Sequence, residues 1–155
     1  MQSCLEDALS ILFRKPLSIV GAGRTDAGVH AHQLFAHVDL DEHVDQDLTF
    51  RLNKLLPKEI AVRNIIAVAQ DAHARFDAVS RSYRYHITTQ KNPFLQKRSY
   101  QFAKPLDLDL MNHAAKILID SEDFKCFSKS KTDVKTYICD IQHAHWQQDL
   151  SLIHI

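Results

Sequence analysis

The three glycines of the chain lie within eight positions of one another, at Gly21, Gly23 and Gly28. Glycine accepts backbone conformations with positive φ and lets other groups approach the main chain closely. Their clustering predicts a tightly folded loop, which also carries one cation, Arg24, and one carboxylate, Asp26. Because extended segments flank this loop on both sides, rigid strands are expected to aim its carboxylate, an arrangement that suits chemistry.

Other interpretations of the loop are open at this point. Asp and Gly are common turn residues, so Asp26 could serve only to cap a local amide. A phosphate cradle has less support, because the loop contains neither GxxxxGK[ST] nor GxGxxG. We expect no metal site, since the His-x-His pairs at 30–32 and 143–145 lack a third ligand in a recognised motif.

Size and composition indicate one ordinary domain or two small ones with a hydrophobic core, because 45% of the 155 residues are hydrophobic. The three cysteines form no CxxC pair and leave one over, which suits a reducing cytoplasm better than a disulfide framework. The sequence shows no secretory signal and no apolar run of transmembrane length, so we expect a cytoplasmic protein without a membrane partner.

Charge is unevenly distributed, although the 19 basic residues balance the 19 acidic ones. Six cations and no acid lie between Arg81 and Lys104, and four lysines follow in 125–135 against the single acid Asp133. A one-sided basic surface binds polyanions despite a neutral total. The alternative is an ordinary solvated face with scattered lysines.

Hydrophobic periodicity predicts helices over 5–13, 48–56 and 110–118. Asp45 or Asp47 is expected to cap the second helix, and Asp107 or Asp109 the third. The expected apolar face of the third helix consists of Leu110, Ala114, Ile117 and Leu118.

Strands are expected at 17–20, 34–40, 80–89 and 100–103, and one strand or a pair of strands at 60–68. A hairpin of 137–146 and 150–155 that turns at 147–149 is expected to follow. Segment 70–73 resembles a connection, which places a domain boundary between 1–72 and 73–155. The predicted fold class is α+β, with two subdomains of mainly antiparallel sheet and helices on one face of each.

Several blocks resemble one enzyme family. The string Gly23-Arg24-Thr25-Asp26-Ala27-Gly28-Val29-His30-Ala31 closely resembles the catalytic signature of bacterial tRNA pseudouridine synthase A. His-Ala-Arg-Phe at 73–76, followed by Arg-x-Tyr-Arg-Tyr at 81–85, resembles the second block of the family, and 123–127 resembles its Asp-Phe-x-x-Phe block. Several blocks in the same order are far more specific than any single motif.

The resemblance implies a pseudouridine synthase fold with an active-site cleft between the subdomains. It also implies isomerisation of uridine to pseudouridine in the anticodon stem-loop of tRNA, at tRNA positions 38–40, by a homodimer without cofactor or metal. Asp26 would be the catalytic nucleophile, and Tyr83 would stack on the target uracil and accept its carbon-bound proton. Arg24 would occupy the space of the extruded base, hold phosphate and favour the ionised Asp26.

Ten residues are expected to contact the RNA. Those at 72–76 match an RNA-contacting segment of the family, and the others are cations suited to phosphate contact. The set is Ala72, His73, Ala74, Arg75, Phe76, Arg81, Arg84, Lys129, Lys131 and Lys135.

The sequence also departs from the family. The opening Gly-Trp strand is absent before Gln2, and the chain stops at Ile155, where the family continues into a region that supplies a basic active-site residue and further strands. We therefore expect a truncated or internal piece, weakly active or inactive alone, whose incomplete second subdomain leaves the final strand as an unpaired edge. A non-catalytic RNA-binding module and a small α+β interaction domain remain the alternative functions.

Overall fold

The computed structural model describes residues 1–41, 44–128, 136–149 and 152–154. Its contacts divide the chain into two compact units, Met1–Arg81 and Ser82–Ile155. The division lies nine residues after the boundary expected at 72/73, because the intervening segment is bonded to the first unit. Ala74 N donates to His37 Nδ1, and the Arg81 guanidinium donates to the carbonyl of Ala22.

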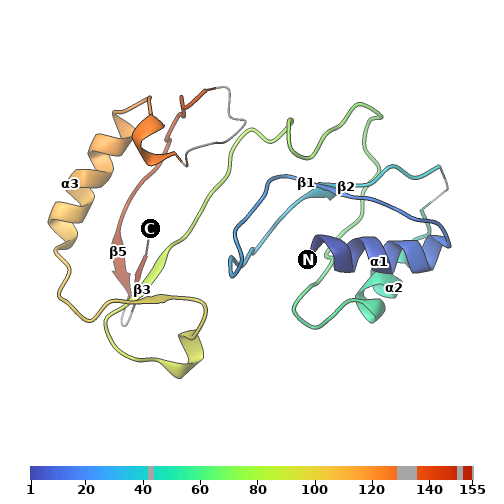
Figure 1. The fold of residues 1–155 in the computed structure, drawn as a ribbon, viewed down its shortest axis with the longest axis horizontal. Coiled ribbons are helices and arrows are strands. Elements are labelled where there is room, and N and C mark those ends of the chain that lie inside the picture. The colour runs from blue at the N-terminus through green and yellow to red at the C-terminus, as the bar shows by residue number, and fades with distance from the viewer. Residues whose placement is uncertain (42–43, 129–135, 150–151, 155) are drawn as a thin grey trace. The chain divides into compact units, whose positions relative to one another are not determined.

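Two helices build the core of the first unit (Figure 1). They are α1 (Gln2–Phe13) and α2 (Leu48–Leu55), and both confirm the helical periodicity of the sequence. Asp47 is the N-cap of α2, although its side chain makes no capping hydrogen bond. The buried residues of this core come from the two helices and their flanks: Ala8, Leu9, Ile19, Leu48, Leu52 and Leu56.

Replacing Leu52 by alanine is expected to destabilise the first unit by about 3 kcal/mol, because Leu52 is 3% exposed and truncation leaves a cavity. Leu55→Ala on the same helix is the matched control, since Leu55 is 45% exposed and its loss should cost less than about 1 kcal/mol. Urea unfolding measures both. Equal losses would contradict the assignment of this core.

The strands of the first unit are shorter than expected. β1 (Val20–Gly21) pairs antiparallel with β2 (Ala36–His37), with Val20 opposite His37. The prediction of strand structure at 60–68 is wrong, because those residues form an irregular segment. Both backbone polar groups of Val62 bond instead to the Asn53 side chain of α2, at 2.7 and 2.8 Å.

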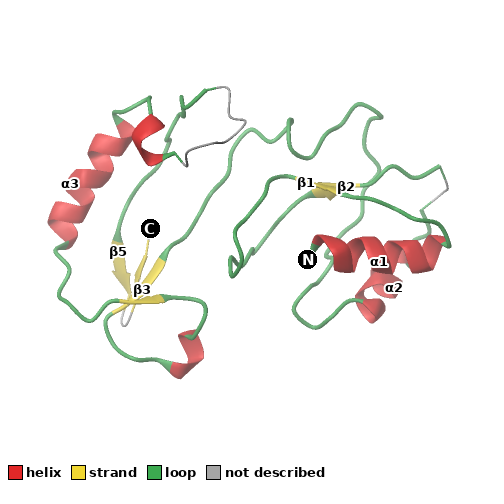
Figure 2. Ribbon diagram, in the orientation of Figure 1, coloured by secondary structure: helices red, strands yellow, loops and turns green. Residues whose placement is uncertain are grey.

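The second unit contains a sheet in the order β4-β3-β6-β5 (Figure 2). Its strands are β3 (His86–Thr88), β4 (Tyr100–Gln101), β5 (Gln147–Asp149) and β6 (Leu152–His154). β3 pairs parallel with β4 and antiparallel with β6, which pairs antiparallel with β5.

Three strand predictions for the second unit are wrong. The first half of the strand expected at 80–89 is irregular, and β3 begins only at His86. The expected turn at 147–149 is β5 itself, whose Asp149 pairs with Leu152 of β6. The final strand is not an unpaired edge, because β6 has a partner on each side.

One longer helix and two short ones complete the second unit. They are α3 (Leu108–Ile119) and the 3₁₀ turns η1 (Pro93–Leu95) and η2 (Lys125–Phe127). The Asp107 side chain caps α3 by accepting from Leu110 N at 3.0 Å, which confirms one of its two predicted caps. No helix of the described residues is long and apolar enough to cross a membrane.

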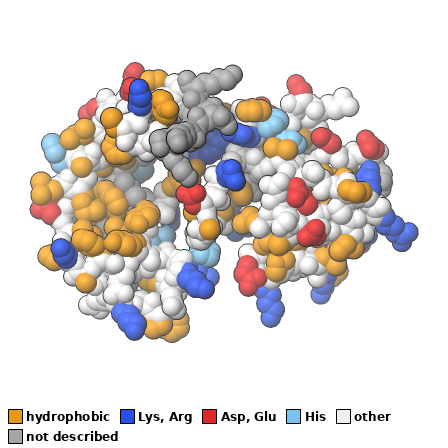
Figure 3. Space-filling model, in the orientation of Figure 1, with side chains coloured by type: hydrophobic (Ala, Val, Ile, Leu, Met, Phe, Trp, Pro, Cys, Tyr) orange, Lys and Arg blue, Asp and Glu red, His pale blue; other side chains and the backbone are white. Residues whose placement is uncertain are grey.

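The predicted apolar face of α3 is mostly wrong. Leu110 is 67% and Ile117 57% exposed, whereas the buried residue of the helix is Ala115. The Asn112 side chain bonds both backbone polar groups of Trp146, at 3.0 and 2.8 Å, so the Asn112 side of α3 faces the protein. Hydrophobic side chains consequently reach the visible surface of this unit (Figure 3).

Candidate active-site loop

Three side chains of α1 fix the segment that enters the glycine loop. Glu6 Oε1 accepts from Ile19 N at 3.0 Å, and Gln2 Nε2 donates to Ile19 O at 3.1 Å. Ser10 Oγ accepts from Leu17 N at 3.0 Å. Because Ile19 is also buried in the core, the entry to the loop is held by both packing and hydrogen bonds.

Glu6 makes this attachment sensitive to pH. The Gln2 amide and the Ile19 N–H both donate to its carboxylate, which lowers the pKa of Glu6 below its ordinary value of 4.5. A carboxyl group whose pKa is lower in the folded state stabilises the fold above its unfolded pKa. That contribution is lost as the pH falls through the folded pKa.

We therefore expect wild type to exceed Glu6→Gln in unfolding free energy at neutral pH, and the difference to shrink progressively below pH 4.5. Urea unfolding over a pH series measures it. Asp7→Asn is the control, because Asp7 is exposed on the same helix and makes no contact with the loop entry among the described residues. A difference that does not depend on pH would contradict the proposed role of the Glu6 charge.

Two backbone hydrogen bonds close the loop itself. Ala22 N donates to Phe35 O at 2.8 Å, and Val29 N donates to Asp26 O at 3.3 Å. Of the three glycines, Gly28 has a positive φ of 87°, the left-handed conformation that favours glycine. Gly28 is therefore the one glycine of the loop whose backbone conformation favours glycine, and it lies within the turn that Asp26 begins.

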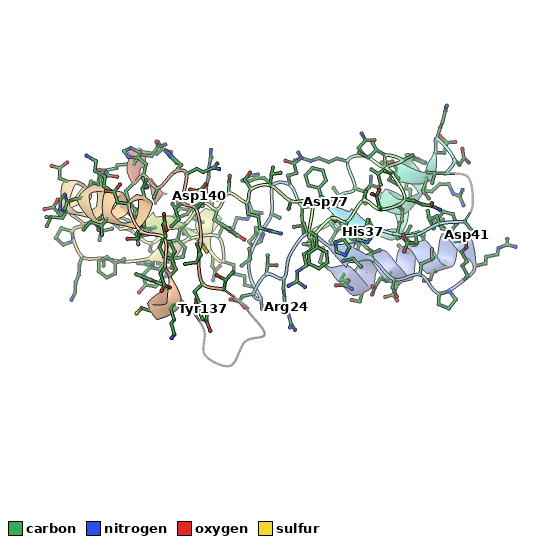
Figure 4. The ribbon with its side chains drawn as sticks, turned by 90° about the horizontal axis from the view of Figure 1, so that it is seen from above. Arg24, His37, Asp41, Asp77, Tyr137 and Asp140 are labelled. Carbon is green, nitrogen blue, oxygen red and sulfur yellow. The ribbon has the colours of Figure 1, made fainter. Side chains whose placement is uncertain are left out.

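Asp26 is exposed at this turn, and its carboxylate accepts no hydrogen bond from the described residues. The interpretation of Asp26 as a cap for a local amide therefore has no support in the structure. No ion pair joins Asp26 to Arg24 either; the ion pair found among the described residues joins Lys15 to Asp41, at 3.6 Å. Arg24 is exposed as well (Figure 4), so both side chains are accessible to a ligand.

A second loop segment, the turn at 72–77, docks on β2. His37 Nδ1 accepts from Ala74 N at 3.0 Å, and the ring of His37 meets that of His73 edge-on at 4.7 Å. The turn closes on itself, because Asp77 Oδ2 accepts from His73 N at 2.6 Å. Figure 4 labels His37 and Asp77, which both belong to this cluster.

The turn presents an aromatic ring and a cation to solvent. Phe76 is 74% exposed, and the Arg75 guanidinium carbon lies 5.8 Å from the centre of its ring. An exposed aromatic ring beside a cation is suited to stacking on a nucleic-acid base. The docking residue His37 was not among the predicted site residues, because the strand alternation marks it only as one of the polar positions.

Arg81 joins the two loop segments. Its Nη2 donates to Ala22 O at 2.7 Å and to Arg75 O at 3.0 Å. The structure thus brings together the glycine loop, the predicted RNA-contacting turn and Arg81 within the first unit.

The remaining predicted site residues belong to the second unit or lie outside the described ranges. Tyr83 is 71% exposed, and Arg84 is exposed beside it. Lys129, Lys131 and Lys135 lie outside the described residues. Among the residues that the structure describes, no group of three His, Cys, Asp or Glu side chains is placed to hold a metal ion.

Comparison with known proteins yields close relatives, although no family model matches the chain. The chain is 54% identical over 152 residues to "tRNA pseudouridine synthase A" of Parabacteroides distasonis, covering 96% of this chain and 60% of the relative. It is 50% identical to the Bacteroides fragilis protein of that name, with the same coverage, and 37% identical to the Bacillus subtilis one, covering 62% of it. The chain thus spans about three-fifths of the length of these curated relatives.

Proposed function

The chain belongs to the tRNA pseudouridine synthase A family, and from this premise we propose that the protein isomerises uridine to pseudouridine in tRNA. One structural observation supports Asp26 as the nucleophile of this reaction. The Asp26 carboxylate is exposed on a loop whose entry is bonded to Glu6 and Arg81 and whose two ends pair as β1 and β2, and it accepts no hydrogen bond from a described residue. A nucleophile must be accessible and held in place, and the exposure of Asp26 and the attachment of its loop support this role.

The proposed reaction begins when the target uridine leaves the base stack, because its glycosidic bond is inaccessible inside a helix. Asp26 then forms a covalent bond with the nucleotide, and the bond between C1′ of ribose and N1 of uracil breaks. The uracil rotates and C5 bonds to C1′, the bond between Asp26 and the nucleotide breaks and returns the carboxylate, and the proton on C5 is lost while N1 gains one. The sequence of steps is redox-neutral and uses a side chain as nucleophile, so the mechanism proposed here uses neither cofactor nor metal.

Other residues have supporting roles in this proposal. Tyr83 stacks on the uracil and accepts the C5 proton, and Arg24 occupies the space of the extruded base and holds a phosphate. The exposed ring of Phe76 suits RNA contact by the turn at 72–77. Phosphates are contacted by the cations Arg84, Lys129, Lys131 and Lys135.

We further propose that the substrate site is the anticodon stem-loop, at tRNA positions 38–40, and that the enzyme acts as a homodimer in the cytoplasm. These assignments rest on the family resemblance of the sequence blocks. Two outcomes would assign a different function: RNA binding without reaction marks a binding module, and absence of RNA binding marks an interaction domain.

The test is tritium release from tRNA that carries tritium on C5 of uracil, using the full-length protein. Release at a rate that depends on protein concentration supports the enzyme, since C5 loses its hydrogen only when it becomes bonded to ribose. A tRNA in which uridine at positions 38–40 is replaced by cytidine is the matched control. Equal release from both substrates would retain the reaction but overturn the proposed site in tRNA.

A further inference from the structure

Arg81 contacts two segments that are far apart in the sequence. Its acceptors are carbonyls of the glycine loop, 59 residues earlier, and of the turn at 72–77, six residues earlier. Both bonds come from Nη2, whose two hydrogens are thereby used. A bond from a guanidinium to an uncharged carbonyl is charge-assisted and stronger than a neutral pair, and the planar fork fixes the direction of both bonds.

The guanidinium also lies against the backbone of the loop. A Cβ placed on Gly23 would lie 3.5 Å from Arg81 Nε, an ordinary contact distance, so the Arg81 side chain lies close to the backbone at Gly23. Outside the β1–β2 ladder, the hydrogen bonds described for 22–35 are the two short backbone bonds of the loop and the one from Arg81. Arg81 is therefore a large part of what fixes the backbone that leads to Asp26.

The turn that shares Arg81 is itself attached to the sheet. His37 of β2 accepts from Ala74 N, and β2 pairs with β1, which leads into the loop. These contacts connect four segments in a ring: β1, β2, the turn at 72–77 and the glycine loop. The side chains of His37 and Arg81 make the contacts between the turn and the other segments. A displacement of the turn by bound RNA is transmitted to the loop through Arg81.

We propose that Arg81 is a positioning residue that couples the turn at 72–77 to the loop carrying Asp26, rather than one of the phosphate ligands. The inference rests on the proposed function and deepens it. A phosphate ligand contributes to affinity and to its salt dependence, and removing one such ligand changes the salt slope by about 1. A positioning residue acts on the rate, because a displacement of about 1 Å at the reacting group costs roughly 100-fold.

The variants are Arg81→Ala and Arg81→Lys, with Arg63→Ala as control, since Arg63 is exposed and has no contact among the described residues. We expect Arg81→Ala to lower kcat by about 10- to 100-fold with KM and the salt slope of tRNA binding unchanged. Arg81→Lys should restore part of kcat, because an ammonium can donate to both carbonyls but lacks the fixed plane that directs the two N–H groups of Nη2. Arg84→Ala provides the contrast, with weaker tRNA binding and a reduced salt slope.

Hydrogen exchange in the RNA-free protein separates this proposal from the proposed function. Arg81→Ala should speed exchange at Ala22 and Val29, the amides of the two loop bonds, and Arg84→Ala and Arg63→Ala should not. This readout holds even if the protein shows no pseudouridine formation. Unchanged exchange, or a loss of tRNA affinity with kcat intact, would overturn the positioning role.

A double-mutant cycle tests the coupling itself. His37→Ala should also speed hydrogen exchange at the loop amides. Its effect should be much smaller when Arg81 is already alanine, because the turn then has no side-chain contact with the loop. Additive effects would show that the turn and the loop respond independently, which contradicts the coupling. If Arg81→Ala does not fold, Arg81→Lys in the same cycle gives the same comparison.

Discussion

Replacing Asp26 by asparagine is expected to lower the rate of pseudouridine formation in tRNA by about 10⁴-fold or more, as loss of a covalent nucleophile does. Asparagine has nearly the same shape but cannot form the covalent bond of the ionised carboxylate. Because the carboxylate has no hydrogen-bond partner among the described residues, the exchange leaves the fold and tRNA binding unchanged. Tritium release and filter binding with the same tRNA measure the two effects separately.

Asp71→Asn is the matched control for this experiment. Asp71 is exposed in the first unit, makes no contact among the described residues and is outside the proposed site, so its variant should keep full activity. An Asp26→Asn protein that retains activity would remove the nucleophile assignment. One that loses tRNA binding or unfolds would instead indicate that the loop carboxylate has a structural function.

Replacing Tyr83 by phenylalanine and by alanine is expected to separate its two proposed roles. Phenylalanine keeps the ring that stacks on uracil and lacks the hydroxyl that accepts the C5 proton, so tritium release should fall by about 10²- to 10⁴-fold with unchanged KM. Alanine removes the ring as well, which should additionally weaken substrate binding by about 1–3 kcal/mol. Tyr83 is 71% exposed, so neither change is expected to disturb the fold.

The control for Tyr83 is Tyr100→Phe. Tyr100 begins β4, is 54% exposed and is outside the proposed site, so loss of its hydroxyl should leave tritium release unchanged. Full activity of Tyr83→Phe would assign proton removal to another group. Equal affinities of the phenylalanine and alanine variants would remove the stacking role.

The helices could be predicted from the sequence, and the strands only in part. β2, β3, β4 and β6 lie within expected segments, but the strand expected at 60–68 does not form and β5 occupies an expected turn. A helix of the length of α1 carries its own signal in spacing and in the proline that follows it. The apolar alternation at 60–68 resembles that of a strand, but Asn53 satisfies the backbone of Val62 from α2, so no ladder forms. Likewise, the face that α3 turns inward depends on Asn112 bonding Trp146, 34 residues away.

In the candidate site, too, features set by neighbouring residues could be predicted from the sequence, and contacts between distant residues could not. The glycine spacing predicts a shaped loop, and the loop is present with Asp26 exposed on it. Arg81 begins a run of cations in the sequence, which suggests phosphate contact, yet its acceptors are carbonyls 59 and six residues away. No local pattern identifies a partner carbonyl, and for that reason the sequence does not reveal His37 and Arg81 as links between the segments.

The position of β6 between β3 and β5 has a consequence for biosynthesis. Ile87 pairs with Ile153, so β3 is translated long before its central partner emerges from the ribosome. The first unit holds its own core within its first 81 residues and can fold while the nascent chain is still growing. At elongation rates of about 5–20 residues per second, β3 waits several seconds for its neighbour, which exposes it to chaperones during that interval.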